Sequence, residues 1–242
     1  MTKLLIATVF GPTKRNRTWL NLQTRFLSQT TKEYKQVAFL NGTSKKLDIE
    51  VLGRSKQNLG HPEALTEVFN LLKETKYDQY LLLDSDAFPV WPGWQSTLMD
   101  HMNQNGVQIA APIRLENLDQ HAHPCTIFMT GKGLHETDWH FQLGGQTNLM
   151  GQKIKAFTLG EFPFLPMVRT NVYNPHPIWG GVYNHMFYHH GAGSRHAHTR
   201  ATKAGIFDHF LSDEDHERIA RRMFKALKTQ PEHYIGKLLG LR

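Results

Sequence analysis

The chain has 242 residues, of which 40% are hydrophobic, 11% aromatic and 20% charged, so that it can build one sizeable hydrophobic core. No apolar run approaches the roughly 20 residues that span a bilayer, which excludes a transmembrane protein, and the single cysteine, Cys125, excludes an internal disulfide and a zinc site of several thiolates. The formal net charge of +7 favours polyanionic partners without saying which.

Strands and helices alternate along the first half of the chain. The run Leu4–Phe10 predicts a buried strand rather than a signal peptide, because it is short and basic residues follow where a cleavage site would belong. Pro62 suits the first turn of a helix, where a missing N–H costs nothing. The predicted elements are a strand at 4–10, a helix at 19–27, strands at 37–40 and 49–52, and a helix from 61 to 72.

The next predicted strand is Tyr80–Leu83, which is apolar on both faces and ends abruptly in Asp84-Ser85-Asp86. A strand of this kind belongs in the middle of a parallel sheet covered by helices. The carboxyl end of such a strand is where open α/β sheets bind their ligands. The acidic segment is therefore expected at the ligand-binding edge.

The pattern loosens after Pro89 and is hardest to interpret between residues 114 and 180. A helix is predicted at 95–103 and strands at 107–113 and 126–129. Two capping boxes, Ser212 with Asp215 and Thr229 with Glu232, predict the last two helices. With no repeat and no long linker, residues 1–242 are predicted to form a single α/β domain with a mostly parallel central sheet flanked by helices.

Asp84 and Asp86 carry the sharpest chemical signal. Two carboxylates one residue apart at the end of a buried strand repel each other unless something positive lies between them. A divalent cation, Mg²⁺ or Mn²⁺, would meet this need and completes its shell with water and nucleotide phosphates. The alternative is that Asp84 caps the following turn and Asp86 is solvated.

The stretch Lys73–Trp94, centred on Leu-Leu-Leu-Asp-Ser-Asp-Ala-Phe-Pro, resembles the Asp-x-Asp region of nucleotide-sugar-dependent glycosyltransferases of the GT-A fold. The segments 20–42 and 188–195 agree with it. The resemblance implies a nucleotide-sugar-binding half at 1–112, an acceptor-binding half at 113–242, and a metal bridging the donor's two phosphates. By the same resemblance, Asp86 ligates the metal, and Asp84 contacts the ribose or reaches the metal through water.

The resemblance also implies where the donor's base lies. Thr8 and Phe10, at the end of the first strand, are where the family usually holds the base. Asn41 stands where many relatives carry an acidic residue, so the identity of the nucleotide base is not predicted. Independently of the family, Gly60 precedes a helix whose N-terminus can accept a phosphate, although an ordinary cap explains it equally well.

Histidines concentrate in the second half, with seven of 15 between His176 and His209. Imidazole is a good ligand for transition ions and would tilt the preference toward Mn²⁺. In GT-A enzymes a C-terminal histidine often joins the acidic pair, and His189 or His190, beside a Gly-Ala-Gly segment, is the candidate. Arg195 belongs to a basic segment suited to folding over a diphosphate.

An inverting transferase needs a carboxylate to take the proton from the acceptor hydroxyl, whereas a retaining one does not. Glu136 and Asp138 follow the strand 126–129 and are the candidates for this base, with Glu161 and Asp208 as further alternatives. The stereochemical outcome stays open.

The function expected is transfer of a sugar from a UDP- or GDP-linked donor to a hydroxyl of a glycan or lipid-linked acceptor. One alternative is a sugar nucleotidyltransferase, although segment 11–15 is a poor version of its phosphate loop. Another is a basic protein that binds membranes or nucleic acid without catalysis. No nucleic-acid motif is present, and nucleic acid is not an expected partner.

A cytoplasmic location is expected, with accessory association at the inner face of an anionic membrane. The expectation of membrane association rests on the helix 217–228, which carries cations opposite its apolar stripe, as an interfacial helix does. These cations are Arg218, Arg221, Arg222, Lys225 and Lys228.

Overall fold

A computed structural model describes residues 3–44, 46–144, 146–147, 150–151, 153–154, 157–191 and 213–241. The helices are α1 (Asn16–Thr30), α2 (His61–Lys73), α3 (Trp94–Gln104), α4 (Gly131–Glu136), α5 (Asp213–Thr229) and α6 (Pro231–Leu239), with a 3₁₀ turn at Leu115–Asn117. The longer strands are β1 (Leu4–Phe10), β2 (Tyr34–Asn41), β3 (Glu50–Ser55), β4 (Gln79–Asp84), β6 (Ile109–Pro112) and β7 (Thr126–Thr130). The short strands are β5 (Ala87–Pro89), β8 (Gln142–Leu143), β9 (Gln146–Thr147), β10 (Lys153–Ile154), β11 (Phe157–Thr158), β12 (Leu165–Met167), β13 (Gly181–Tyr183) and β14 (Phe187–His189).

The central sheet has seven strands in the order β12-β6-β7-β4-β1-β2-β3. Every neighbouring pair is parallel except those of β7, which runs antiparallel to both β4 and β6. Strand β4 lies in the middle, as its two apolar faces predicted. The predicted fold class, a mostly parallel sheet flanked by helices, is confirmed.

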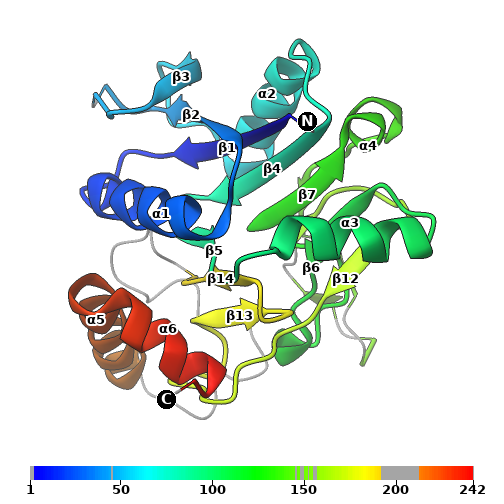
Figure 1. Cartoon of the computed structure of the whole chain (residues 1–242). Coiled ribbons are helices and arrows are strands. Elements are labelled where there is room, and N and C mark those ends of the chain that lie inside the picture. The colour runs from blue at the N-terminus through cyan, green and yellow to red at the C-terminus, as the bar shows by residue number, and fades with distance from the viewer. Residues whose placement is uncertain are drawn as a thin grey trace.

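Alternation along the strands sends their side chains into two cores. On β4, Tyr80 and Leu82 pack with α2 and α4, whereas Leu81 and Leu83 pack with α3. Figure 1 shows α2 and α4 on one side of the sheet and α1 and α3 on the other. Residue 84 follows the same alternation as Tyr80 and Leu82, so that the Asp84 side chain faces the layer of α2.

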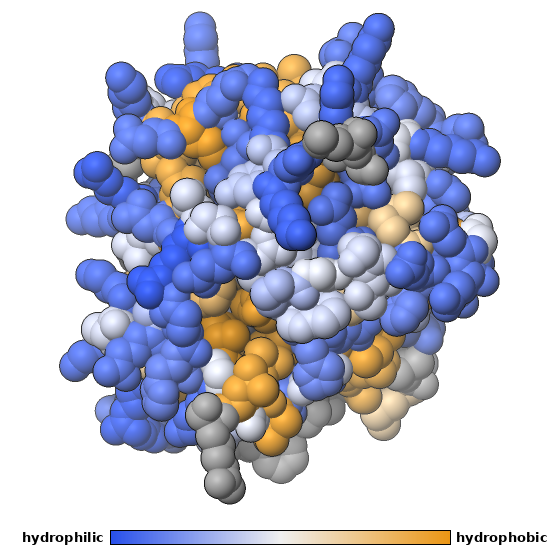
Figure 2. All heavy atoms as spheres, viewed as in Figure 1, coloured by the Kyte–Doolittle hydropathy of each residue, from blue (hydrophilic) through white to orange (hydrophobic). Residues whose placement is uncertain are grey.

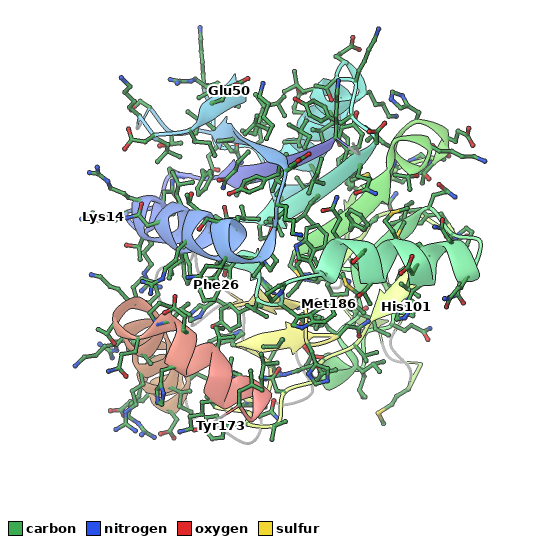
Figure 3. The ribbon with its side chains drawn as sticks, in the orientation of Figure 1. Lys14, Phe26, Glu50, His101, Tyr173 and Met186 are labelled. Carbon is green, nitrogen blue, oxygen red and sulfur yellow. The ribbon has the colours of Figure 1, made fainter. Side chains whose placement is uncertain are left out.

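A second, smaller sheet lies beyond α1 and was not predicted from the sequence. It has the order β13-β14-β5 and is antiparallel throughout. Phe26 of α1, labelled in Figure 3, stacks on Phe88 of β5 with ring centroids 4.6 Å apart. Strand β5 begins one residue after Asp86, so the small sheet starts at the acidic segment and continues away from the central sheet.

The C-terminal helices complete the layer around the small sheet. The apolar stripe of α5 packs inward, because Ala220, Met223 and Leu227 are all buried beside Trp19 of α1. The prediction that this stripe serves as the apolar side of an interfacial helix is therefore wrong. None of the helices in the described ranges is long and apolar enough to cross a membrane.

The two predicted capping boxes have different outcomes. Ser212 lies outside the described residues. Thr229 is the last residue of α5, and its hydroxyl donates to the carbonyl of Lys225 at 2.9 Å, while Gln230 occupies the N-cap of α6. The prediction that Thr229 begins the last helix is therefore wrong. Pro231, which follows the N-cap Gln230, suits the first turn of α6.

An ion pair between Arg25 and Glu232 joins α1 to α6, with an Nη2–Oε2 distance of 2.7 Å. Partial burial acts to raise the pKa of Glu232, but hydrogen bonds from its own backbone, from Gln29 and from Arg25 together lower this pKa below the ordinary 4.5. A lowered carboxyl pKa stabilises the fold at pH values above the unfolded pKa. That stabilisation is lost as the pH falls through the folded pKa.

We expect the Glu232→Gln substitution to lower the free energy of unfolding by about 0.5 kcal/mol at neutral pH, because the pair is half-exposed and screened by solvent. Urea unfolding of both proteins at neutral pH and near pH 3 measures this. The two curves should differ at neutral pH and converge in acid. A difference that is the same at both pH values would contradict the ion-pair explanation.

Candidate metal centre

The acidic segment is held in place by buried hydrogen bonds. The Asp84 amide donates to the carbonyl of Cys125 on the adjacent β7 side at 2.9 Å. Gln23, fully buried on α1, donates through Nε2 to the carbonyls of Asp84 and Ala87, both at 2.8 Å. The Oε1 of Gln23 in turn accepts the Thr8 hydroxyl at 3.2 Å. One side chain thus fixes both ends of the turn that carries the two carboxylates.

Strand pairing brings a distant histidine to this turn. In the small sheet, His189 of β14 lies opposite Ala87 of β5. The amide of His190 donates to the carbonyl of Asp86 at 3.0 Å, which closes the pairing. His189 therefore lies beside Asp84 and Asp86 although about one hundred residues separate them in the sequence. The reason is that β14 pairs with β5, the strand that follows the acidic segment.

Asp84, Asp86 and His189 form a cluster suited to a cation. The Nε2 atom of His189 lies 3.8 Å from Oδ2 of Asp84 and 3.7 Å from Oδ1 of Asp86, and all three ligand atoms lie within 4.8 Å of one another. An ion bound at about 2.1 Å separates its opposite ligands by about 4.2 Å, so the two histidine distances fit one shared ion. The Asp86 side chain is only 7% exposed, which favours charge neutralisation.

The donor set also fits a divalent cation. Carboxylate oxygens suit Mg²⁺ and Mn²⁺ alike, and an imidazole nitrogen is a common ligand of transition ions. The described residues fit a divalent cation, with Asp84, Asp86 and His189 as the protein ligands.

Two further histidines border this cluster and were not predicted from the sequence. His61, the first residue of α2, places Nε2 3.3 Å from Oδ1 of Asp84. The ring of His123 lies 5.8 Å from that of His189. Only His61 could have been predicted from the sequence. The helix α2 connects to the start of β4 and runs back along the sheet, so its first residue has to lie near the carboxyl end of β4, where Asp84 is.

His190 has a different role from its neighbour. Its side chain is buried, its Nδ1 shares a hydrogen bond of 2.8 Å with the hydroxyl of Tyr188, and its ring lies 5.1 Å from that of Trp19. Successive residues of a strand point to opposite faces. Of the two candidates named above, the structure thus brings only His189 to the acidic pair.

We expect His189→Ala and His190→Ala to separate these roles. His189→Ala should weaken Mn²⁺ binding about 10- to 100-fold with little change in stability, since one ligand is lost and the site is partly open. His190→Ala should lower the free energy of unfolding by about 1–3 kcal/mol, because a buried hydrogen bond and ring packing are lost.

Titration of Mn²⁺ followed by electron paramagnetic resonance, together with urea unfolding, measures both quantities for both variants. Weaker Mn²⁺ binding in His190→Ala but not in His189→Ala would show that the ligand is assigned to the wrong histidine.

The residues expected to contact the donor's base are engaged inside the protein. Thr8 and Phe10 are fully buried, the first bonded to Gln23 and the second within the core around α1. Asn41 donates to the carbonyl of Leu59 at 3.0 Å and accepts its amide at 2.8 Å. The side chains of Thr8 and Phe10 thus face the interior of the protein, and their contact with the nucleotide base stays a prediction.

Asn41 and Gly60 instead shape the segment that precedes α2. The two bonds from Asn41 tie the end of β2 to Leu59, and Gly60 is the N-cap of α2, its carbonyl accepting the amide of Ala64 at 2.9 Å. The N-terminus of α2 consequently lies beside Asp84, and His61 is the residue of the helix that contacts it. Its use as a phosphate site stays a prediction.

The residues expected to act as a base lie elsewhere. Strand β7 runs antiparallel to β4, so that Thr126 pairs with Leu83 whereas Thr130, the N-cap of α4, pairs with Gln79 at the far end of β4. Helix α4 therefore begins at the edge opposite the acidic segment, and Glu136 ends this helix, with Asp138 two residues further on.

Their contacts agree with that position. Glu136 pairs with Lys132 at 3.7 Å and Asp138 with His140 at 2.8 Å, and both side chains are well exposed. Each carboxylate is thus paired at the protein surface, and the role of either one as the base stays a prediction. Glu161 is exposed. Arg195 and Asp208 lie outside the described residues.

The one cysteine contributes no nucleophile. Cys125 is fully buried, and burial, with the nearby charge of Asp84, raises its pKa well above the ordinary value. The thiolate is the reactive form of cysteine. The thiol is therefore neutral and unreactive, and its residue serves through the backbone carbonyl that holds Asp84.

No protein-family model matches the sequence, and no curated protein matches it. Solved structures with a similar backbone include TarS of S. aureus, at 13% identity and a TM-score of 0.42 over 59% of this chain and 50% of the other. A second is the galactosyltransferase LgtC in complex with donor and acceptor sugar analogues, at 14% identity and a TM-score of 0.40 over 55% of this chain and 60% of the other.

A third is the mannosyltransferase PcManGT from Pyrobaculum calidifontis in complex with GDP-Man and Mn²⁺, at 6% identity and a TM-score of 0.41 over 53% of this chain and 44% of the other. The chain spans less than two thirds of the length of each of these structures. These likenesses concern the backbone alone, and we argue the function below from the residues of this chain.

Proposed function

We propose that the chain is a metal-dependent glycosyltransferase of the GT-A type, which transfers a sugar from a UDP- or GDP-linked donor to a hydroxyl of a glycan or lipid-linked acceptor. The observation that carries this proposal is the cluster of Asp84, Asp86 and His189 at the carboxyl end of the central strand. In open α/β sheets this edge is where ligands bind.

Asp84, Asp86 and His189 would hold the cation, Mn²⁺ in preference to Mg²⁺. When bound, such an ion supplies Lewis-acid neutralisation of the negative charge that builds on a departing diphosphate. Both carboxylates project from a turn fixed by Gln23, so the ligand oxygens are held in place before any substrate arrives. A site held in this way needs little reorganisation during the reaction.

The N-terminus of α2 would assist with the diphosphate. Its first turn presents backbone N–H groups and the positive end of a helix dipole, which favour an anionic group. His61 in that turn lies 3.3 Å from Asp84, so the helix end and the proposed cation would act on the same region. Gly60, at the N-cap, has no side chain of its own, and the Glu63 carboxylate lies in the space that a Cβ at this position would fill.

The two halves of the chain would divide the substrates between them. Residues 1–112 contain β1, α2, β4 and the acidic pair, and we assign the donor to this half. Residues 113–242 supply His189 and would bind the acceptor, with Arg195 assisting at the diphosphate. The product analysis below distinguishes the inverting from the retaining outcome.

A thermal-shift screen of UDP and GDP, each with and without Mn²⁺, tests the proposal. A ligand that binds only the native state at about 100 times its dissociation constant adds about 2.7 kcal/mol of stability, which in a chain of this size is a shift of about 5–10 °C. We expect a shift of this size with one nucleoside diphosphate plus Mn²⁺, and a much smaller one when either is omitted.

The corresponding nucleotide-sugar is then incubated with the protein. A transferase releases the nucleoside diphosphate, and the anomeric configuration of the product distinguishes inversion from retention. A nucleotidyltransferase would instead require pyrophosphate. Absence of any metal-dependent shift with either nucleotide would refute the proposal.

A further inference from the structure

Three exposed apolar residues form a projection at the end of α6. Val172, Tyr173 and Leu241 are 70%, 43% and 66% exposed. They are contiguous, since the amides of Val172 and Tyr173 both donate to the carbonyl of Leu238 and Gly240 packs against Val172. Figure 3 labels Tyr173 below the end of α6, and Figure 2 shows hydrophobic side chains exposed there beside hydrophilic ones.

A groove of about 340 Å³ adjoins this projection between α5 and α6, and Tyr173 forms part of its wall. Its apolar lining comes mainly from α5, and cationic side chains stand around it. The residues concerned are Ile219, Met223 and Ala226 for the apolar part and Arg222 and Lys237 for the cations.

The charges around the groove are unevenly paired. The acids of α5 gather at its start, where Asp215 pairs with Arg218 and Glu217 with Arg221. The two cations that line the groove, Arg222 and Lys237, have no carboxylate of the described chain within 4 Å. The ammonium of Lys237 lies 4.3 Å above the ring of Tyr173, so that cation and aromatic ring face the same surface.

We propose that this face, defined by Val172, Tyr173, Leu241 and the groove beside them, docks on a bilayer that contains anionic phospholipid. Amphipathic aromatic rings and short apolar projections insert at the boundary between headgroups and acyl chains. Unpaired lysines and arginines at the same level attract anionic headgroups. The apolar part of the contact comes from the exposed side chains of Val172, Tyr173 and Leu241, whereas Ala220, Met223 and Leu227 of α5 stay buried in the core.

The binding surface stands independently of the proposed reaction. Figure 1 shows α5 and α6 at the opposite end of the molecule from β3 and α2. A basic protein with a net charge of +7 would also bind anionic vesicles weakly through any of its surfaces. The experiment must therefore compare this face with a matched set of cations elsewhere.

The test is flotation of the full chain with vesicles of phosphatidylcholine alone and with one third phosphatidylglycerol, at low and at high salt. The wild-type protein should float with the anionic vesicles and dissociate at high salt. Arg222→Glu combined with Lys237→Glu should lower the partition coefficient about tenfold or more. The control, Lys56→Glu with Lys76→Glu on exposed positions of the opposite end, makes the same change in net charge and should lower it much less.

A second variant tests the apolar part without altering charge. Val172→Ser with Leu241→Ser should weaken vesicle binding while leaving the unfolding temperature unchanged, since both side chains are exposed, and Val51→Ser on β3 should weaken nothing. No binding of the wild-type chain to anionic vesicles, or equal losses in the two charge-reversed variants, would overturn the proposal. Neither result would contradict the proposed binding of metal and nucleotide, which is measured separately.

Discussion

Replacing Asp86 by alanine is expected to remove Mn²⁺ binding and to lower the rate of sugar transfer about 10³-fold or more. Asp86 is the more buried of the two carboxylates and lies 3.7 Å from His189, so its removal leaves an incomplete set of protein ligands. Metal-assisted stabilisation of a leaving group is worth several kcal/mol, and about 4 kcal/mol corresponds to a factor of 10³. The measurements are nucleoside diphosphate release and Mn²⁺ titration by electron paramagnetic resonance.

The matched control is Asp100→Ala, which removes an exposed carboxylate from α3 and should change neither quantity. Circular dichroism establishes that both variants are folded. Transfer at the wild-type rate by a folded Asp86→Ala protein would mean that this carboxylate is not part of the catalytic machinery.

Replacing Gln23 by leucine is expected to lower the free energy of unfolding by about 2–4 kcal/mol. Leucine has a similar volume but donates no hydrogen bond, so the carbonyls of Asp84 and Ala87 and the hydroxyl of Thr8 lose a buried partner together. Each of the three hydrogen bonds lost contributes about 0.5–1.5 kcal/mol net to stability. In a chain of this size the unfolding temperature should fall by about 5–15 °C.

The same substitution should weaken Mn²⁺ binding, because Gln23 positions the turn between Asp84 and Ala87 without touching the ion. Asn21→Leu makes a comparable change on the exposed side of the same helix and is the control for both measurements. If Gln23→Leu unfolds at the wild-type temperature, the hydrogen bonds of Gln23 do not hold the turn between Asp84 and Ala87.

Local pattern was sufficient to predict the frame of the site. A strand apolar on both faces has to lie inside a sheet, and β4 lies in its middle. The acidic pair follows that strand directly, so its place at the edge of the sheet required no tertiary information. The strands and helices of the first half were predicted for the same reason, since each is long enough to show its own period.

Long-range pairing decided what the sequence left open. His189 reaches the acidic pair because a three-residue strand, β14, pairs with another, β5, and strands this short carry no periodic signal. The same pairing separates His189 from His190, because adjacent residues of a strand face opposite ways. Both were equally good candidates in the sequence.

The direction of one strand in the second half could not be predicted. Glu136 and Asp138 are candidates for the base because they follow the strand 126–129 in the sequence. Strand β7 is antiparallel to β4, so the chain leaves it at the opposite edge. Nothing in the five residues of β7 reveals its direction.

The central claim is that Asp84, Asp86 and His189 together bind one divalent cation. Anomalous diffraction at the manganese edge, from crystals soaked in Mn²⁺ with the nucleoside diphosphate that stabilises the protein, measures this directly. We predict one strong peak within about 2.3 Å of an oxygen of each carboxylate and of Nε2 of His189. A well-ordered turn with no peak between these three side chains would contradict the account.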